Sequence, residues 1–576
     1  MPQTFLFPTG PRGRPRQVSR QSLLLDATIR DFSGGWNVID NDLNLDTKFS
    51  KKLENMQRSI DGSNSVRPGT KLFSETSEHL DEIINCEYFN GYVVCVGANG
   101  KIVRIDATGA VILVWDDNFA SSLSGSPLSW DNTTFASFAV FNGELIICNG
   151  INKPLIMNVS GGVTYLQDLA TNSNANTPIC RYVKTHGRYL LMAGDLTIGN
   201  EDRLYISNTD TSGTWVSDDA PNDAVNLSLG SRVPSGSHVI KGIGQFRDKL
   251  LVFFENAVLP GTLGVFDSGI HTPTFDDAFE NIGGISHRTI QTVEEDVMFS
   301  DTSGVASINR ALFTGNTKSD RVSQLIDPEY LDAIGNMKIT NTLEDRAWSI
   351  WDSQSNNLMT FFPNSDVAAN NTETRCFVYK RNKALKIEAW SDWRNWNFRS
   401  GCRSALKRVF LTEGTQVFIL GEEHATGDRI FKDYELDQEM WDDDTPWSDY
   451  TGWNPHSDNN DSGIPIKFNW ELPWADNNKR FLTKNSRYIN FDTDGDNRFT
   501  VQMFTDNNFI SRTDLGEDWQ EDELKWDDDL GWDVDVYDPA LEMTFEGGDS
   551  PGFGADEFGE DFGGGRPTRL EKLFAW

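Results

Sequence analysis

The pattern in this sequence that comes nearest to a metal site is a run of acidic residues at alternate positions. Asp492, Asp494 and Asp496 could together present oxygen ligands to a calcium ion. An EF-hand loop carries its glycine at the sixth position and closes with a glutamate at the twelfth, whereas here the glycine is fourth and the twelfth residue is Met503. We therefore interpret the segment as a hairpin turn and predict no metal site, with calcium binding near these residues left open.

No other arrangement of reactive residues matches a catalytic pattern. The sequence has no G-x-S-x-G nucleophile elbow, Walker A loop, H-E-x-x-H helix or G-x-G-x-x-G turn in a fitting context. Acidic residues are so numerous that no pair can be assigned as the acid and base of a glycosidase. The seven histidines are spread singly, as surface or packed residues usually are: His79, His186, His238, His271, His287, His424 and His456. We predict a protein that is not an enzyme and that needs no cofactor.

An eight-residue segment nearly matches the Asp-box turn, S-x-D-x-G-x-T-W, of sialidase-like propellers. Asp210, Thr214 and Trp215 fit the motif, whereas Asn208 replaces its serine and the glycine falls one place late. An Asp-box stabilises a turn even where it is intact. The segment therefore favours a propeller architecture and says little about glycosidase chemistry.

Trp390, Trp393 and Trp396 form a ladder with a spacing of three residues. This spacing does not suit a regular strand, so we expect a bulged loop or a helical turn. Packing at a sheet edge is our preferred interpretation, and a platform that stacks sugars or bases is the alternative.

The cysteines and the apolar segments indicate an intracellular, non-membrane protein. Six cysteines are scattered without a C-x-x-C pair or a cluster at metal spacing, so we predict reduced core residues: Cys86, Cys95, Cys148, Cys180, Cys376 and Cys402. No apolar run reaches the roughly 18 residues that a membrane helix needs. The N-terminus also lacks the apolar core of a signal peptide.

The net charge is strongly negative and unevenly distributed. The chain has 51 basic and 86 acidic residues, a formal charge of −35, which disfavours binding to nucleic acid or anionic membranes through basic patches. The excess is concentrated near the C-terminus: Asp433–Asp449 holds eight acidic residues without Lys or Arg, and Asp514–Asp561 holds nineteen with one Lys.

The first twenty residues have the opposite charge. Residues 2–20 carry Arg12, Arg14, Arg16 and Arg20 among prolines and glycines and cannot form a packed element. The segment is either a frayed terminus or a flexible arm that orders against an acidic neighbour.

A short sequence pattern recurs through the middle of the chain and predicts its fold. At Asn90-Gly91 and Asn142-Gly143 a tight turn leads directly into an apolar, β-branched strand, which is a hairpin signature. Looser copies mark units that begin near residues 89, 141, 186, 246, 294, 344 and 413. A spacing of about 45 to 70 residues fits the blades of a β-propeller. Because one blade cannot bury both of its faces, the blades should stack into a ring.

We therefore predict a mainly β protein: a β-propeller of about six or seven blades, an appended small β-sandwich-like module and one short N-terminal helix. The helix would begin at Asp46 and place Phe49, Leu53 and Met56 on one face. The expected parts are a flexible basic arm (1–30), a strand-helix-hairpin clasp (31–80), the propeller (81–431), an acidic Trp-rich linker with a β module that would form a platform or dock fibres (432–513), and an acidic Gly-rich tail whose apolar end docks (514–576).

Several segments within roughly residues 31–350 resemble, in order and spacing, one known family. They are Gly34-Gly35-Trp36-Asn37, Asn55, Gly62 with Val66-Arg67-Pro68-Gly69-Thr70, residues 187–194 with 204–207, and residues 283–286 with 297–305. Together they resemble the tail nozzle proteins of short-tailed bacteriophages, that is, tail tubular protein B and related tail hub proteins. Beyond residue 430 the chain resembles the family only in having a β module that could dock fibres or form a platform.

The resemblance implies a structural virion protein in the phage tail, assembled in the host cytoplasm. Six copies would form a tube below the portal and adaptor rings, hold tail fibres or a tail needle, retain the packaged double-stranded DNA and conduct it on ejection. Six chains of −35 carry −210, so an acidic bore would repel phosphates. The arm with Arg12, Arg14, Arg16 and Arg20 would bind an acidic adaptor surface.

Two other classes of function stay open. A phage-borne glycan-binding or glycan-degrading β-propeller protein is the main alternative, because of the Asp-box-like turn and the tryptophan ladder. A cytoplasmic scaffold that binds peptides is a third class, for which the sequence offers no specific support.

Overall fold

The structure is a computed structural model that describes residues 33–40, 45–58, 64–116, 135–166, 176–215, 224–234, 238–263, 273–314, 321–338, 346–363, 374–382, 385, 387–421 and several short strands between residues 432 and 573. It divides into two compact units, Met1–Asn477 and Asn478–Trp576. We describe each unit by itself.

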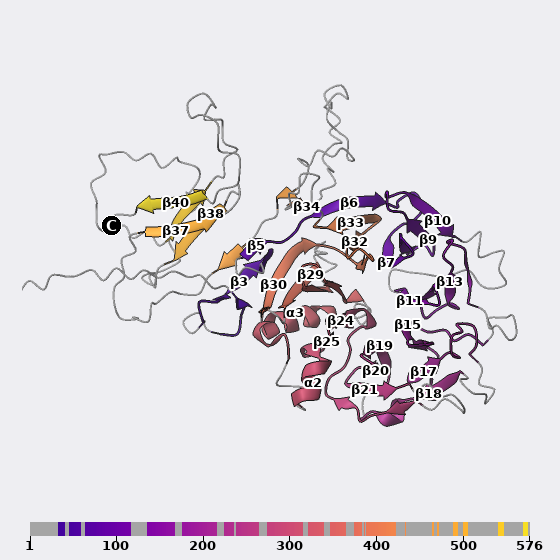
Figure 1. Ribbon diagram of the computed structural model, residues 1–576. Coiled ribbons are helices and arrows are strands. Elements are labelled where there is room, and N and C mark those ends of the chain that lie inside the picture. Colours follow the sequence, from indigo (N-terminus) through magenta and orange to yellow (C-terminus); the bar gives the residue numbers. More distant parts are fainter. Residues whose placement is uncertain are drawn as a thin grey trace, which may run out of the picture. The chain divides into compact units, whose positions relative to one another are not determined.

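Seven sheets of three to six strands follow one another along the first unit (Figure 1), which also has three two-stranded sheets among its described residues. Sheet one consists of β7 (Ile83–Phe89), β8 (Tyr92–Gly97), β9 (Ile102–Ile105) and β10 (Val111–Trp115). Sheet two consists of β11 (Ser137–Phe141), β12 (Glu144–Cys148), β13 (Leu155–Met157) and β14 (Val163–Tyr165). Sheet three consists of β15 (Tyr182–His186), β16 (Tyr189–Ala193), β17 (Arg203–Ile206) and β18 (Val225–Ser228). Sheet four consists of β19 (Ile240–Phe246), β20 (Lys249–Phe254), β21 (Ala257–Thr262), β22 (Thr274–Phe275) and β23 (Phe279–Glu280).

The remaining three sheets carry the described helices and complete the ring. Sheet five consists of β24 (Gln291–Val293), β25 (Asp296–Asp301) and β26 (Gly304–Ser307), followed by helices α2 (Ile308–Thr314) and α3 (Asp327–Lys338). Sheet six has β27 (Trp348–Asp352), β28 (Asn357–Phe362), β29 (Thr374–Asn382) and β30 (Ile387–Trp396). Sheet seven has β31 (Ser400–Arg403), β32 (Val409–Glu413), β33 (Gln416–Leu420) and β6 (Thr70–Glu75).

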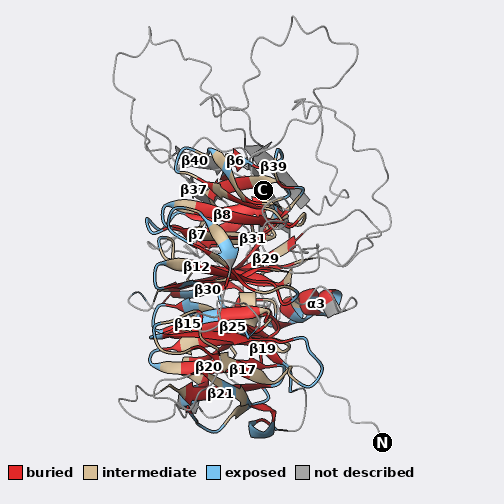
Figure 2. Cartoon of the chain, turned by 90° about the vertical axis from the view of Figure 1, so that its right-hand side faces the viewer, coloured by how far each residue is buried: buried red, intermediate tan, exposed pale blue. Residues whose placement is uncertain are grey.

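The first strands of the seven sheets touch one another in a closed circle. Each contacts the next, and β31 contacts β7. Strand β6 precedes the first sheet in the chain, yet it pairs with β33 as the outermost strand of the last sheet. A ring of radial sheets closed by a strand from the other end of the ring is a β-propeller, so the predicted architecture is confirmed with seven blades. Buried residues run through its strands, while exposed residues lie mostly in the connecting loops (Figure 2).

The recurring turns have the hairpin geometry that their sequence predicts. Asn90 and Gly91 both have positive φ, 48° and 90°, as a two-residue hairpin turn requires. The Asn90 amide also donates a 3.1 Å hydrogen bond to the carbonyl of Val159 in the next blade, and Asn142 bonds the blade after that in the same way. In blades one to five the predicted turn joins the first two strands; the turn near residue 413 instead joins β32 to β33.

The cysteines of the first unit are core residues. All six are free thiols and all six are buried, which confirms the prediction. Burial in apolar surroundings raises the pKa of the Cys148 thiol well above its ordinary value, so this thiol stays protonated.

The predicted N-terminal helix is wrong. Residues from Phe49 onward form β2 (Phe49–Ser50), β3 (Lys52–Glu54) and β4 (Met56–Arg58), preceded by β1 (Gly35–Trp36) and followed by β5 (Asn64–Val66). Asp46 accepts a hydrogen bond from the backbone of Lys48, which forms a turn rather than a helix cap. Leu53 is buried because β3 joins the edge of blade six beside β30, and this pairing overrides the helical spacing.

The tryptophan ladder lies in a strand, not in a loop or a helical turn. Trp390, Trp393 and Trp396 all belong to β30. The pairing with β29 is regular from Trp390 to Trp393, so these two side chains lie on opposite faces of the sheet, and a β-bulge between Trp393 and Trp396 places Trp396 on the same face as Trp393. Trp393 and Trp396 pack edge to face in one core cluster, and Trp390 packs in another. All three are buried, so they serve sheet packing and not a stacking platform.

The predicted C-terminal parts are divided differently. β36 (Asn469–Glu471) pairs with β3 and so belongs to the propeller unit, in which β34 (Lys432–Asp433) pairs with β35 (Ile464–Pro465).

In the second unit, strands of the predicted β module pair with strands of the predicted tail. β37 (Tyr488–Thr493) pairs with β40 (Thr568–Leu573), and β38 (Phe499–Phe504) pairs with β39 (Ala540–Phe545). Asp494 and Asp496 lie outside the described residues. The two strands that flank them pair with β40 and β39, so the described part contains no pairing between β37 and β38 of the kind a hairpin would need.

Candidate functional site

The residues predicted to bind partners are not placed by the structure. Arg12, Arg14, Arg16 and Arg20 lie outside the described residues. Within the described ranges, no three His, Cys, Asp or Glu side chains are arranged to hold a metal ion. None of the described helices is long and apolar enough to cross a membrane. The fold does gather polar side chains from different blades, in two groups.

The first group surrounds a short helical turn at the centre of the ring. The 3-10 turn η2 (His287–Thr289) contacts β19, β25 and β27, which belong to three different blades. A Cβ at Gly242 of β19 would lie 2.5 Å from Cδ1 of Ile290 and 3.1 Å from Cα of His287. Only glycine therefore allows the turn to approach the inner strand of blade four this closely.

Arg288 extends from this turn to four further elements around the axis. Its Nη2 donates a 2.7 Å hydrogen bond to the carbonyl of Arg399, next to blade seven, and a 3.4 Å bond to Oδ1 of Asn85 in blade one. The guanidinium lies 4.4 Å from the ring centroid of Phe135, before blade two, and 6.0 Å from that of Trp348 in blade six. One always-charged side chain thus ties the inner edges of several blades together.

His287 is held as a neutral imidazole. Its Nδ1 accepts a 3.2 Å hydrogen bond from the backbone N–H of Ile243, which leaves the proton on Nε2. Burial, together with the positive charges of Lys184 and Arg288, lowers the pKa of His287 to about 3. The imidazole ring also packs 5.0 Å from the ring of Tyr182.

Glu87 and Lys184 complete the axial group from blades one and three. Burial raises the pKa of Glu87 to about 7, although a hydrogen bond from the Tyr88 N–H and the charge of Lys184 favour the ionised form. Burial lowers the pKa of Lys184, and Glu87 partly offsets that effect. The Lys184 side chain is nevertheless exposed, so solvent reaches it although protein surrounds it.

The axial group could exchange a proton. Glu87 could act as a general acid near neutral pH. The charged side chains that shift the pKa values of Glu87 and His287 are basic, Lys184 and Arg288, whereas glycoside hydrolysis uses a pair of carboxyl groups about 5 to 10 Å apart. Sequence reasoning missed these residues. Glu87 and Lys184 could have been noticed as charged residues within inner strands. The sequence around Arg288 gives no such signal, because its contacts come from other blades.

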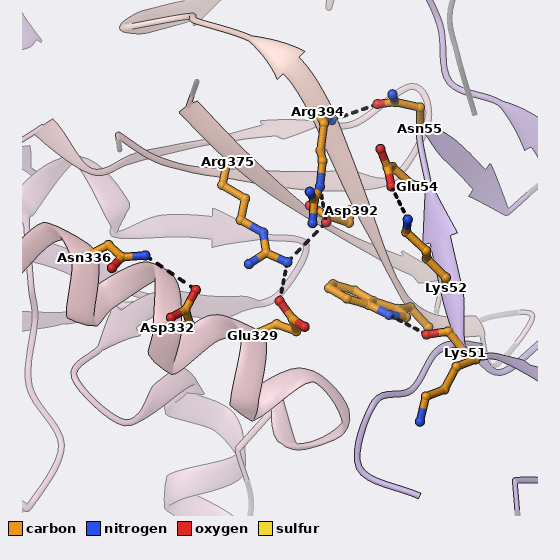
Figure 3. A network of polar contacts seen from close by, with 11 residues as sticks. Lys51, Lys52, Glu54, Asn55, Glu329, Asp332, Asn336, Arg375, Asp392 and Arg394 are labelled. Carbon is orange, nitrogen blue, oxygen red and sulfur yellow. Dashed lines mark hydrogen bonds and ion pairs between the residues drawn. The ribbon is translucent and has the colours of Figure 1, made fainter. Parts of the chain in front are cut away.

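The second group lies where the N-terminal strands cross blade six (Figure 3). We call residues 33–75 the strap. Asn55 of the strap has φ 55°, and its Oδ1 accepts hydrogen bonds from the backbone of Arg394 (2.7 Å) and from Nε of Arg67 (3.0 Å). The Asn55 N–H in turn donates to the carbonyl of Asp392 at 2.7 Å. Asn55 and Arg67 are both fully buried.

Ion pairs extend this group to helix α3. The carboxylate of Asp392 accepts hydrogen bonds from Nε of Arg394 (2.9 Å) and from Arg375 (3.2 Å), and Arg375 also bonds Glu329 of α3 at 2.6 Å. The guanidinium of Arg67 lies 4.3 Å from the ring centroid of Trp396. We call Asn55, Arg67, Arg375, Asp392 and Arg394 the lock, because they join the strap to blade six.

The lock contains two of the residues on which the family resemblance rests, Asn55 and Arg67. A third, Gly35, has φ 70°, and a Cβ there would lie 2.7 Å from Cβ of Ala389 in β30. These residues therefore fasten the strap to the ring; they do not line a cleft.

Fold and site together define a strap-closed, seven-bladed β-propeller with a group of charged side chains between its inner strands. No protein-family model and no curated protein sequence matches the chain. Among solved structures it is similar to YCF48 bound to D1 peptide (10% identity, 63% of this chain and 97% of that one, TM-score 0.35), the WD40 β-propeller domain of Doa1 (9%, 62% and 98%, 0.33) and streptogramin B lyase (12%, 62% and 97%, 0.36). Likenesses this distant carry no argument about function.

Proposed function

We propose that the chain is a structural, non-enzymatic subunit of the tail nozzle of a short-tailed bacteriophage, located in the virion tail after assembly in the host cytoplasm. The lock is the observation that supports this best. Residues that carry the resemblance to nozzle proteins are the buried residues that fasten the strap across blades six and seven.

A wall that retains packaged DNA must keep its shape under load. The strap suits that task because it joins two blades at once: β3 extends blade six and β6 completes blade seven. Separating these blades would break a sheet pairing together with the buried bonds of Asn55 and Arg67, which are costly to leave unmade.

In this proposal DNA passes between subunits and not through a single propeller. Inside each ring η2 contacts three blades, and Arg288 bonds the Arg399 carbonyl and Asn85, which narrows the passage along the axis. Six copies around a common bore would conduct DNA, and the −35 charge of each chain would keep phosphates from adhering. The partners would be the portal-adaptor ring and the fibres or needle of the tail.

The glycan-directed alternative has lost the observations that motivated it. The tryptophan ladder is buried in β30. In the Asp-box-like segment, Asp210 forms an ion pair with Arg188, and Trp215 donates a 2.9 Å hydrogen bond to the carbonyl of Ser212, so both stabilise a turn.

Quantitative mass spectrometry of purified particles from the source of this gene tests the proposal, combined with antibody labelling. We expect about six copies per particle, the number of a closed ring, located at the tail. Absence from particles, or labelling only of peripheral fibres, would overturn it. Cleavage of capsular or lipopolysaccharide glycans by the purified chain would then favour the alternative.

A further inference from the structure

A loop in blade three presents an apolar tip to solvent. The loop joins β16 to β17, and the buried carboxylate of Asp195 holds it by accepting hydrogen bonds from the Thr197 N–H (2.9 Å) and the Tyr205 hydroxyl (2.7 Å). Ile198 at the tip is 94% exposed, and Leu196 beside it is 49% exposed. Such exposure on a fixed loop suits a contact site, because little conformational entropy remains to be lost on binding.

The loop borders a mainly apolar pocket that includes two acidic residues. The pocket has a volume of about 620 Å³ and is lined by Gly199, Glu201, Asp202, Gly230, Ser231, His238 and Val239. Asp202 also accepts a 2.9 Å hydrogen bond from the Gly230 N–H, and Glu201 accepts one of 2.8 Å from the Gly199 N–H. The pocket wall is therefore preformed, and it places two carboxylates beside an apolar knob.

An occupant of this surface should combine apolar side chains with positive charge. Residues 2–20 of the chain have this composition: Phe5-Leu6-Phe7 are apolar, and the segment has four arginines and no acidic residue. In a chain with a net charge of −35, so basic a segment is complementary to the Glu201–Asp202 wall.

The ring geometry is compatible with a second copy as the source of that segment. The chain enters the ring at β1, which contacts β30 of blade six, whereas the pocket belongs to blade three. Three blades of separation is the largest possible in a ring of seven. A contact between opposite sides of two copies is heterologous, the kind that builds closed rings. We propose that the Ile198 loop and its pocket bind residues 2–20 of a second copy of this chain. The proposal does not rest on the nozzle function.

The test is binding of a fluorescent peptide of residues 2–20 to the full-length chain, measured by anisotropy. We expect saturable binding that weakens in high salt. Ile198→Asp should weaken it about tenfold, as removal of one apolar anchor does. Glu201→Gln, which removes the charge but keeps an acceptor for the Gly199 N–H, should weaken binding about fivefold. Leu406→Asp, at a 76% exposed apolar position in blade seven, is the matched control and should bind normally.

Self-association of the full chain, followed by sedimentation velocity, gives a second readout that needs no virion. Deletion of residues 2–20 and Ile198→Asp should each reduce it. Equal peptide affinity in the wild type and Ile198→Asp would overturn the proposal. So would self-association that survives the deletion but is lost in Ile198→Asp, since that result assigns the loop to the folded surface of a partner. Cross-links from the arm to the loop that are only intramolecular would exclude the second copy.

Discussion

The side-chain oxygen of Asn55 accepts a 3.0 Å hydrogen bond from Nε of Arg67, and both side chains are fully buried. The same guanidinium donates to the carbonyl oxygens of Pro68 and Arg394. One arginine thus satisfies acceptors on the strap and on blade six at the same time. Four predictions follow from this lock and from the ring axis.

Replacing Arg67 should release the strap. Arg67→Ala leaves buried acceptors without their donor and should lower the free energy of unfolding by about 3 to 5 kcal/mol. Arg67→Lys should recover only part of the lost stability, because an ammonium group cannot reproduce the planar arrangement of donors in a guanidinium. Denaturant titration followed by tryptophan fluorescence measures both. Lys249→Ala, which breaks an exposed ion pair with Asp276, is the control and should cost under about 1 kcal/mol. A similar small cost for Arg67→Ala would show that the lock does not hold the ring.

Two glycines should respond to the same substitution with opposite sign. A Cβ at Gly283, which leads into η2, would lie 2.0 Å from the carbonyl oxygen of Glu255, so Gly283→Ala should destabilise the ring by about 1 to 3 kcal/mol. Gly335 lies inside helix α3 with open space around its Cα, so Gly335→Ala should stabilise by about 0.5 to 1 kcal/mol. Parallel thermal melts of the two variants decide this. Equal shifts would contradict the packing of η2 against blade four.

His287 should make the ring sensitive to acid. Its pKa is lowered to about 3 in the fold from an ordinary value of 6.5, so between these values the unfolded chain binds more protons. Stability from this group is therefore lost as the pH falls from about 6.5 to about 3, at up to about 1.4 kcal/mol per pH unit. In His287→Gln this slope should disappear. Unfolding free energies of both proteins at several pH values measure the difference, and parallel curves would refute it.

Glu87 should make the folded chain less stable as the pH rises, which is the opposite of the effect of His287. Its pKa is raised from 4.5 to about 7, so the folded chain holds the proton over this range and its contribution is lost as the pH rises. Glu87→Gln mimics the protonated form and should flatten the curve between about pH 4.5 and 7. In the wild type the two slopes oppose each other between about pH 4.5 and 6.5. The double variant should therefore resemble the wild type there more closely than either single variant does.

Local chemistry decided which elements could be predicted. Asn90-Gly91 needs only its own backbone geometry to form a turn, so the sequence was enough to find it and to predict about six or seven blades. The number seven comes from the sheets of the structure. Leu53 and Met56 fit a helix as well as they fit strands, and strand β30, more than 300 residues away, determines the outcome.

The functional groups depend even more on distant partners. Arg288 bonds residues of two other blades, and Arg67 bonds Arg394. These partners lie 12 or more residues away in the sequence for all but the Pro68 carbonyl, so no local pattern indicates the contacts. The buried tryptophans of β30 show the same limit, because their placement depends on pairing with β29 and on a bulge between Trp393 and Trp396.

The pairing of β6 with β33 also sets an order of events during synthesis. Glu75 leaves the ribosome about 340 residues before its partner Gln416. At roughly 5 to 20 residues per second, β6 spends about 20 to 70 s without the strand that completes its sheet. The part of the ring made first is therefore the last to be secured, and the growing chain carries an open strand edge until blade seven has been translated.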